Sequence, residues 1–409
     1  MDMPMGAAID VAADDEVRPA KVRSQVFQRA DLIRAILGAC TVIERRNTIP
    51  VLETVLITIQ DDRIVARATN LDQEVTLDLG EAPQRGAISH CLMSPHAVAG
   101  LLKGMTGDHV SLLPTDGGKI AMSGQDFTAK ISTLPAIDFP RISQGPEGWA
   151  TDIPASVLDL MIRVSGAMSR EETRYYLNGL HIGHLRDWTY RISATDGHRL
   201  YFADVEWPGE QKLPNGGIII PRHAVEKMAR YRDRKSDQPV RLSAHAAAAT
   251  NNFIDWAGSG APSAKLQFGA TVLKTKLIDG TFPDISRVIP DAGGSTCSFR
   301  AATADLRRAI RALAFGATEK SPAIRLSLGD GKLRIGAKFA IDGVDAEYSI
   351  EAKTTGHLEM GFNGHYLLAV LDAMHTDEVV FLLRDQSAPA LIVDPTGEGM
   401  RAVLMPMRL

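Results

Sequence analysis

The side chains best suited to acid–base chemistry lie in one short stretch, where Asp196 and His198 flank Gly197. A carboxylate beside an imidazole is a pairing that general acid–base catalysis uses. Catalysis of that kind also needs a nucleophile and a group that orients the base, and nothing in this stretch supplies both. Asp-Gly favours a tight turn, because Gly adopts backbone angles that other residues avoid. We therefore predict a surface turn, and a hydrolase that uses Asp196 and His198 is a minor alternative.

The turn follows a segment with strand character, and similar segments recur along the chain. They alternate apolar and polar residues, as half-buried strands do. Amphipathic helices, recognised by apolar residues at helical spacing, separate them. The predicted strands are residues 51–60, 64–69, 74–79, 177–182, 190–194, 333–337 and 379–383.

The helices occur as a pair that is repeated three times. The first and third opening helices share the pattern Ala-Asp-Leu-x-Arg-Ala-Ile, and such self-similarity indicates one structural unit used repeatedly. We expect an α+β fold of three repeated domains, each with two helices packed on an antiparallel sheet. The opening helices are residues 30–39, 154–168 and 303–314, and the second helices are residues 94–105, 221–231 and 363–374.

Domain boundaries follow from the repeat and from composition. The predicted domains are residues 21–147, 148–290 and 291–409. An Ala- and Asp-rich stretch at residues 1–20 has neither the basic nor the apolar region of a signal peptide, so we expect a disordered extension. An Ala- and Gly-rich stretch at about residues 244–265 is interpreted as a loop insertion.

Composition excludes several classes of protein. The chain has 409 residues, which is enough for two or three domains at about 150 residues each. Its net charge of −4 excludes a generally basic coat protein, so any attraction to nucleic acid must come from local clusters of charge. Three distant cysteines fit neither a disulfide framework nor a zinc site, and no stretch of 18 apolar residues occurs. We expect a soluble cytoplasmic protein without a metal or cofactor.

Six motifs in the chain match those of a known family, in the family's order. They are residues 132–140 (STLPAIDFP), 173–180 (TRYYLNGL), 194–200 (ATDGHRL), 275–290 (TKLIDGTFPDISRVIP), 360–363 (MGFN) and 405–409 (MPMRL). On these motifs the chain resembles the bacterial sliding clamp, the β subunit of DNA polymerase III, over about residues 21–409. The resemblance implies a non-catalytic processivity factor. It also implies a head-to-tail homodimer whose six domains form a ring around duplex DNA, with helices lining the hole.

The resemblance further implies a hydrophobic pocket for short linear motifs of the replicative polymerase, the clamp loader and repair polymerases. Flexible thioethers near the C-terminus suit such a pocket, although this tail also fits a last strand packed into the core. The matched positions of the deep part are Leu177, Thr195, Gly197, His198, Arg199, Leu200, Pro283, Val288, Val403 and Met405. Those of the adjoining groove are Arg174, Tyr176, Asn363, Tyr366, Pro406 and Met407.

Contact with DNA needs cations on helices that face phosphates. Arg34, Arg163, Arg307, Arg308 and Arg311 lie on predicted helices, and their repetition favours this role over a plain solvated face. The family positions carried over are Arg46, Arg170, Arg174, Tyr175 and Arg222. Glu171 stands where the family often has Gln, and His96 and His223 stand where Arg or Lys is common. These departures predict weaker or more pH-dependent contact with DNA.

The resemblance assigns the dimer seam to Phe315 of one copy and a strand near Ala129 and Ile131 of the other. Ala129 replaces the family's usual aromatic residue, so we expect a seam that is repacked around Phe127 or weakened. Phe315 fits an ordinary helix core equally well. An alternative to a housekeeping clamp is a specialised or inhibitor-resistant clamp from a mobile element or a resistance locus.

Overall fold

The computed structural model describes residues 24–44, 46–60, 63–81, 89–142, 149–206, 213, 216–245, 262–316, 323–339, 344–397 and 399–408. Residues 1–20 and most of the predicted insertion, residues 246–261, lie outside the described residues. The chain divides into two compact units. Unit 1 comprises Met1–Ala68 and Leu77–Phe139, and unit 2 comprises Thr69–Thr76 and Pro140–Leu409.

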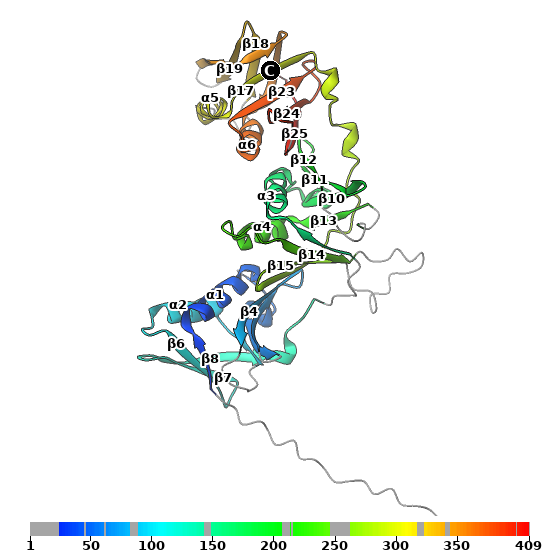
Figure 1. Cartoon of the computed structure of the whole chain (residues 1–409). Helices are drawn as coiled ribbons and strands as arrows, with labels where there is room; N and C mark the ends of the chain where they lie inside the picture. The colour runs from blue at the N-terminus through cyan, green and yellow to red at the C-terminus, as the bar shows by residue number, and fades with distance from the viewer. Residues whose placement is uncertain are drawn as a thin grey trace, which may run out of the picture. The chain divides into compact units, whose positions relative to one another are not determined.

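Unit 1 contains most of the first repeat (Figure 1), whereas Thr69–Thr76 of this repeat are counted in unit 2. Its helices α1 (Arg29–Ala39) and α2 (Pro95–Gly104) pack together through buried apolar residues such as Leu32, Ile36 and Leu102. Its strands form an antiparallel sheet in the order β1-β6-β7-β8-β5-β2-β3-β4. They are β1 (Gln25–Gln28), β2 (Val55–Gln60), β3 (Arg63–Thr69), β4 (Gln73–Glu81), β5 (Ser89–Leu92), β6 (His109–Thr115), β7 (Lys119–Ser123) and β8 (Thr128–Pro135).

The second repeat opens unit 2 with helices α3 (Ala155–Val164) and α4 (Arg222–Tyr231). Strands β9, β14, β15 and β16 pair in that order, and β13, β10, β11 and β12 form part of another sheet. These strands are β9 (Trp149–Ile153), β10 (Gly179–Arg186), β11 (Thr189–Thr195), β12 (Arg199–Glu206), β13 (Ile218–Pro221), β14 (Val240–His245), β15 (Ser263–Phe268) and β16 (Thr271–Lys276).

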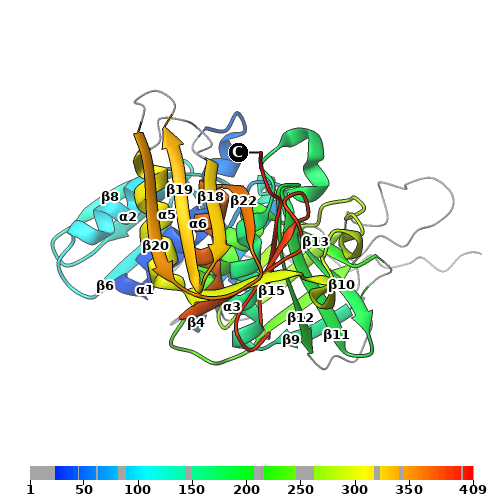
Figure 2. The same ribbon diagram turned by 90° about the horizontal axis from the view of Figure 1, so that it is seen from above.

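The third repeat completes unit 2 with helices α5 (Thr303–Gly316) and α6 (Gly364–Met374). Strand β25 pairs with β12, so one nine-stranded sheet runs from the second repeat into the third. Figure 2 shows β18, β19 and β20 side by side in a separate sheet, in which β22 pairs with β18. The strands are β17 (Cys297–Ala302), β18 (Ala323–Gly329), β19 (Lys332–Phe339), β20 (Val344–Glu351), β21 (Lys353–Thr355), β22 (Leu358–Asn363), β23 (Glu378–Leu383), β24 (Ala390–Val393) and β25 (Arg401–Leu404).

The predicted α+β repeat is therefore confirmed, with two helices on antiparallel sheet in each copy. Two strand predictions start too early. Pro50–Glu53 forms a 3₁₀ helix because Pro50 occupies its first position, and the strand begins at Val55. Leu177 likewise ends a 3₁₀ segment, Glu172–Leu177, and the next strand begins at Gly179. None of the helices in the described part of the chain has the length and apolarity needed to cross a bilayer.

Candidate functional site

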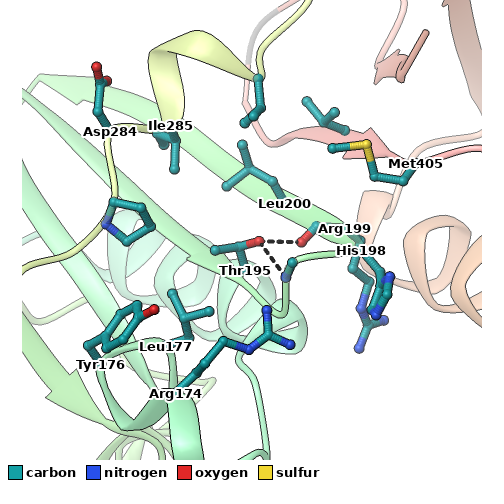
Figure 3. Close-up of a pocket in the computed structure, with 14 residues that line it drawn as sticks. Arg174, Tyr176, Leu177, Thr195, His198, Arg199, Leu200, Asp284, Ile285 and Met405 are labelled. Atoms are coloured by element: carbon teal, nitrogen blue, oxygen red, sulfur yellow. Dashed lines mark hydrogen bonds between the residues drawn. The ribbon is translucent and has the colours of Figure 1, made fainter. Parts of the chain in front are cut away.

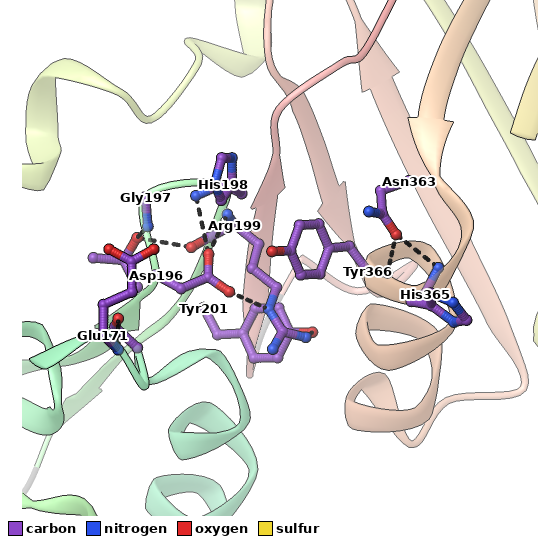
Figure 4. Close-up of polar contacts among 11 residues, drawn as sticks. Glu171, Asp196, Gly197, His198, Arg199, Tyr201, Asn363, His365 and Tyr366 are labelled. Carbon is purple, nitrogen blue, oxygen red and sulfur yellow. Dashed lines mark hydrogen bonds and ion pairs between the residues drawn. The ribbon is translucent and has the colours of Figure 1, made fainter. Parts of the chain in front are cut away.

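The turn that joins β11 to β12 is held by its own side chains. Thr195 Oγ1 donates a hydrogen bond to the Arg199 carbonyl at 2.7 Å and accepts one from the Gly197 amide at 3.1 Å (Figure 3). Asp196 Oδ1 accepts bonds from the His198 and Arg199 amides at 2.9 and 3.0 Å, and its Oδ2 accepts one from Arg199 Nε at 3.0 Å (Figure 4). The carboxylate is thus committed to the turn, which argues against an acid–base role.

Gly197 is required by this geometry. Its φ of +92° lies in the region that side chains disfavour, and a Cβ there would lie 2.7 Å from Arg174 Nη1. The close approach places the Arg174 guanidinium against the turn. Arg174 is held from its other side by Glu171, whose Oε2 accepts bonds from Nε at 2.9 Å and Nη2 at 2.7 Å.

Beside this turn lies a pocket of about 270 Å³, which we call pocket A (Figure 3). Its floor is apolar, because Leu177, Leu200 and Val403 are each less than 5% exposed and belong to one core cluster. Met405 closes one side, where its amide donates to the His198 carbonyl at 2.9 Å. The complete lining is Arg174, Tyr176, Leu177, Thr195, Gly197, His198, Arg199, Leu200, Pro283, Asp284, Ile285, Val288, Val403 and Met405.

Opposite the turn, the wall of pocket A is a covering segment that includes a short 3₁₀ helix, Ile285–Arg287. Asp284 caps that helix by accepting hydrogen bonds from the Ser286 amide and hydroxyl at 3.1 and 2.6 Å. Ile285 is buried against the floor, whereas Val288 stays 39% exposed. An apolar floor with a partly exposed apolar wall and polar groups at the edge suits a ligand that is itself mostly apolar.

The predicted deep positions all line pocket A, but only part of the predicted groove does. Asn363 caps α6, where its Oδ1 accepts bonds from the His365 and Tyr366 amides at 2.9 and 3.2 Å (Figure 4). The amide of Met407 donates to the Gly361 carbonyl at 2.8 Å, which ties the tail to β22. Neither these residues nor Pro406 and Tyr366 line the pocket, while Arg174 and Tyr176 do.

Tyr366 does not line pocket A but contacts two residues that do, His198 and Arg199. Its ring stacks on His198 and lies 5.0 Å from the Arg199 guanidinium carbon. Arg199 Nη1 also donates to the Tyr201 hydroxyl at 3.3 Å. Burial raises the pKa of Tyr201 to about 12, although Arg199 opposes part of this shift. Tyr201 is therefore a neutral hydrogen-bonding group that holds Arg199 in the wall.

Two lining residues, Asp284 and Ile285, were missed from the sequence. Phe282, Ile285 and Val288 are spaced by three residues, which is the period of a 3₁₀ turn that directs apolar groups to one side. That spacing could have indicated that Ile285 faces the pocket. It indicates this only weakly, because the segment is short and contains a proline.

The sequence comparisons agree with the three repeats. Models of the DNA polymerase III beta subunit match the chain over residues 25–143 for the N-terminal domain, 152–284 for the central domain and 286–408 for the C-terminal domain. The chain belongs to the bacterial beta sliding clamp family. The beta sliding clamps of Pseudomonas putida and Caulobacter vibrioides are 32% and 30% identical to it, and each match covers 94% of this chain and 99% of the relative.

Solved clamp structures share the fold. The sliding clamp of Bartonella birtlesii bound to griselimycin aligns with a TM-score of 0.83 at 30% identity, covering 94% of this chain and 99% of that one. A Pseudomonas aeruginosa clamp with a ligand aligns with the same TM-score at 28% identity, covering 94% of this chain and 100% of that one.

Two of the clamp's predicted DNA-binding residues, Arg170 and Arg222, lie near each other in unit 2. Tyr175 is 54% exposed, and Arg170 is exposed beside Arg222. Burial, followed by the charge of Arg170, lowers the pKa of Arg222. Among the described residues, Arg222 Nη2 has no hydrogen-bond partner. Arg174 instead faces pocket A, and Arg46 is exposed in unit 1.

Several helix arginines of the clamp are already paired with carboxylates. Arg34 pairs with Asp31 at 2.7 Å, and Arg308 pairs with Asp305 at 2.9 Å. Arg307 and Arg311 both approach Asp372, at 3.0 and 4.0 Å. These pairs reduce the charge that the helices offer to phosphates, so Arg170 and Arg222 are the stronger candidates.

The predicted seam residues of the clamp differ in their exposure. Ala129 is half-buried on β8, whereas Ile131 on the same strand is only 7% exposed and faces the core of unit 1. Phe315 lies in α5, and its side chain is outside the described part of the structure. Ile131 can therefore contribute to a seam mainly through its backbone.

Proposed function

We propose that this chain is a DNA sliding clamp that gives processivity to the replicative polymerase, with pocket A as the docking site for polymerase, clamp loader and repair polymerases. Pocket A carries the partner-binding part of the proposal. Its floor of Leu177, Leu200 and Val403 offers an apolar side chain a place away from water, and burying one is worth about 1.5–3 kcal/mol.

The edge of pocket A supports a docking role for short peptide motifs. Arg174 and Thr195 bring polar groups to a mostly apolar lining, and such groups fix the orientation of a bound peptide. Met405 has a flexible thioether that adapts to different apolar anchors. One pocket with these properties serves several partners in turn.

Arg170, Arg222 and Tyr175 support contact with duplex DNA. The two arginines lie close enough for the charge of one to affect the other, and neighbouring cations of this kind attract phosphates. A ring closed around DNA needs only weak contacts that do not depend on base sequence. Such contacts permit sliding.

A head-to-tail homodimer is the proposed assembly. Strand β20 pairs only with β19 among the described residues, and β5 pairs with β8 only at residues 133–135, so β20 and β8 both leave backbone groups open for pairing. β20 carries exposed Asp345, Glu347 and Glu351, whereas β8 carries exposed Lys130. Opposite charges on two open edges favour their association.

We infer domains at residues 21–147, 148–290 and 291–409 and a location in the bacterial cytoplasm. We also infer that the protein is not an enzyme, because Asp196 is committed to its turn and the His198 ring stacks on Tyr366. Among the described residues, no group of three or more His, Cys, Asp or Glu side chains is arranged to hold a metal. The relatives carry the plain name beta sliding clamp, which does not favour the specialised alternative.

The test is fluorescence polarisation with a labelled peptide that carries Gln followed by a Leu-Phe pair. We expect saturable binding that Met405→Ala weakens about tenfold, since Met405 lines pocket A. Met407→Ala is the matched control, because Met407 lies two residues away and does not line the pocket. Deletion of residues 405–409 should abolish binding. Unchanged binding by the folded, truncated protein would contradict the proposal.

A further inference from the structure

A second hollow of about 460 Å³, which we call pocket B, adjoins pocket A. The two pockets share Pro283, Asp284 and Ile285. These residues belong to the ridge, defined here as residues 282–286, which has one side in each pocket. A chain bound in pocket A therefore reaches pocket B by crossing a few residues.

Both pockets lie over one face of the nine-stranded sheet. The pairs Thr195–Leu200 and Leu200–Val403 place two floor residues of pocket A, together with Thr195 at its edge, on that face. His181 pairs with Ser193, and Gly183 pairs with Arg191, which puts the floor of pocket B on the same face of β10 and β11. Alternation along β11, at Arg191, Ser193 and Thr195, links the two floors.

The ridge is anchored to this face by two apolar side chains. Phe282 stacks on His181 with ring centroids 4.5 Å apart and planes inclined by 3°. His181 is fixed in turn by a 3.0 Å contact from Nε2 to the Gly216 carbonyl and a 3.3 Å contact from Nδ1 to the Ser193 hydroxyl. Ile285 packs in the same core cluster as Phe282. The ridge is thus a fixed wall between two preformed pockets.

Arg191 brings a cationic hydrogen-bond donor to pocket B, and Asp284 is the carboxylate in the same lining. Asp204 accepts hydrogen bonds from Arg191 Nε and Nη2 at 2.6 and 2.8 Å, and a further bond from Arg401. One carboxylate therefore neutralises one of two guanidinium groups. Arg191 lines pocket B, and its Nη1 has no hydrogen-bond partner among the described residues. Asp284 is balanced locally by Arg287, whose Nε donates to it at 3.2 Å.

The outer edge of pocket B is apolar. Leu185 lines it and is 44% exposed, which is high for a leucine on a strand. Gly183 has no side chain to fill the space, and a Cβ there would lie 2.7 Å from the His181 ring. The hollow therefore offers a donor at its base and an apolar contact at its edge.

We propose that pocket B binds an acidic segment of the same partner polypeptide whose docking motif occupies pocket A. This inference rests on the proposed function of pocket A. A carboxylate from the segment accepts a charge-assisted hydrogen bond from Arg191, while the stem of the acidic side chain lies on Leu185. Partners that share one apolar motif would then differ in affinity according to the charge of the residues beside it.

The test compares labelled peptides by fluorescence polarisation. The core peptide carries the Gln and Leu-Phe motif, and four further peptides add either four acidic or four lysine residues at one end or the other. Four residues reach at most about 14 Å, enough to cross a ridge of this size. We expect one acidic flank to tighten binding about three- to tenfold over the core peptide, and lysine at the same end to give no gain.

Two variants assign the effect to pocket B. Arg191→Gln removes the free donor, and Leu185→Asp adds a repelling charge at a side chain that is 44% exposed. Each should remove the gain from the acidic flank and leave core-peptide affinity unchanged. Leu113→Asp is the matched control, since this leucine is 38% exposed on β6.

Equal affinity of core and flanked peptides, or an acidic gain that survives both variants, would overturn the inference while leaving pocket A intact. Failure of the core peptide to bind at all would instead overturn the proposed function, and this inference with it. The two failures are therefore distinguishable in one set of titrations.

Discussion

The imidazole of His198 lies against the phenol ring of Tyr366, with ring centroids 5.8 Å apart and planes inclined by 21°. His198 belongs to the turn after β11, whereas Tyr366 lies on α6 of the third repeat. The contact therefore connects the wall of pocket A to a different repeat of unit 2. Arg199 adds a second connection, because its guanidinium lies over the same ring.

Tyr366→Ala is expected to weaken motif binding without touching the pocket lining. The substitution removes one ring–ring and one cation–ring contact, each worth about 0.5–1.5 kcal/mol, so His198 and Arg199 lose their support. We expect peptide affinity to fall about three- to tenfold in fluorescence polarisation. Tyr366→Phe keeps both ring contacts and should bind as the parent does. Parent-like binding by Tyr366→Ala would exclude this supporting role.

Gly197→Ala should damage both the turn and the pocket. A φ of +92° costs a residue with a side chain about 1–2 kcal/mol, and the new methyl group displaces Arg174. Gly331→Ala is the matched control, because its φ is +72° and its added methyl group meets nothing within 4 Å. We expect a similar fall in thermal midpoint for both variants and weaker peptide binding only for Gly197→Ala. Equal binding by the two variants would contradict this prediction.

The repeats were predictable because they depend on short-range signals. Helices such as Arg29–Ala39 and Thr303–Gly316 carry apolar residues at helical spacing and share a sequence pattern, so their positions follow closely from the chain. The turn around Gly197 was predictable for the same reason, since Asp-Gly restricts the local backbone. The deep residues of pocket A came from the resemblance to the clamp family, and all of them line the pocket.

The rest of the site depends on long-range contacts that sequence spacing does not encode. Asn363 lies in a matched motif, but its side chain is used to cap α6, and this competition between capping and lining is decided by tertiary structure. Met407 turns away because its amide pairs with Gly361. The ion pairs of Arg307 and Arg311 with Asp372 join two helices more than 60 residues apart, so this reduction in free charge was also not predictable.

Contact with DNA should depend on Arg222 and Arg170 more than on other exposed cations. Removing one cation that binds a phosphate should lower the slope of log affinity against log salt by about 0.9. We expect Arg222→Gln and Arg170→Gln each to lower it by about this amount in binding to a duplex oligonucleotide. Arg287→Gln removes the same charge from the edge of pocket A and serves as control. A slope unchanged by Arg222→Gln, or lowered equally by the control, would argue against this interface.

The proposed dimer should be sensitive to charge on β8. Lys130 is exposed on that strand, and Lys130→Glu would face the acidic residues of β20 in the other copy. We expect a weaker dimer, with a higher dissociation constant for the monomer–dimer equilibrium in sedimentation equilibrium. High salt should partly restore the dimer, since salt screens exposed charges. Lys103→Glu, at an exposed position on α2, should leave the dimer unaffected. If Lys130→Glu had the same dimer dissociation constant as the parent, the dimer seam would not involve this part of β8.

The stability of the chain should depend on pH through His181. Burial lowers the pKa of His181 below its usual value, partly offset by its contact with the Gly216 carbonyl. Between about pH 6.5 and the lowered value, the unfolded chain binds a proton that the folded chain does not, so stability falls as pH decreases through this window. Below the pKa that His181 has in the folded chain, its destabilising effect has reached its full size. Above about pH 7, His181 does not change the free energy of unfolding with pH.

His181→Gln keeps a side-chain donor for the Gly216 carbonyl but cannot take up the proton. We expect its thermal midpoint, measured by calorimetry from pH 5 to pH 8, to fall less steeply toward acid than that of the parent. His184→Gln, an exposed histidine on the same strand, is the control and should follow the parent curve. If the thermal midpoints of the parent and His181→Gln changed with pH in the same way, protonation of His181 would not destabilise the folded chain, which would contradict this prediction.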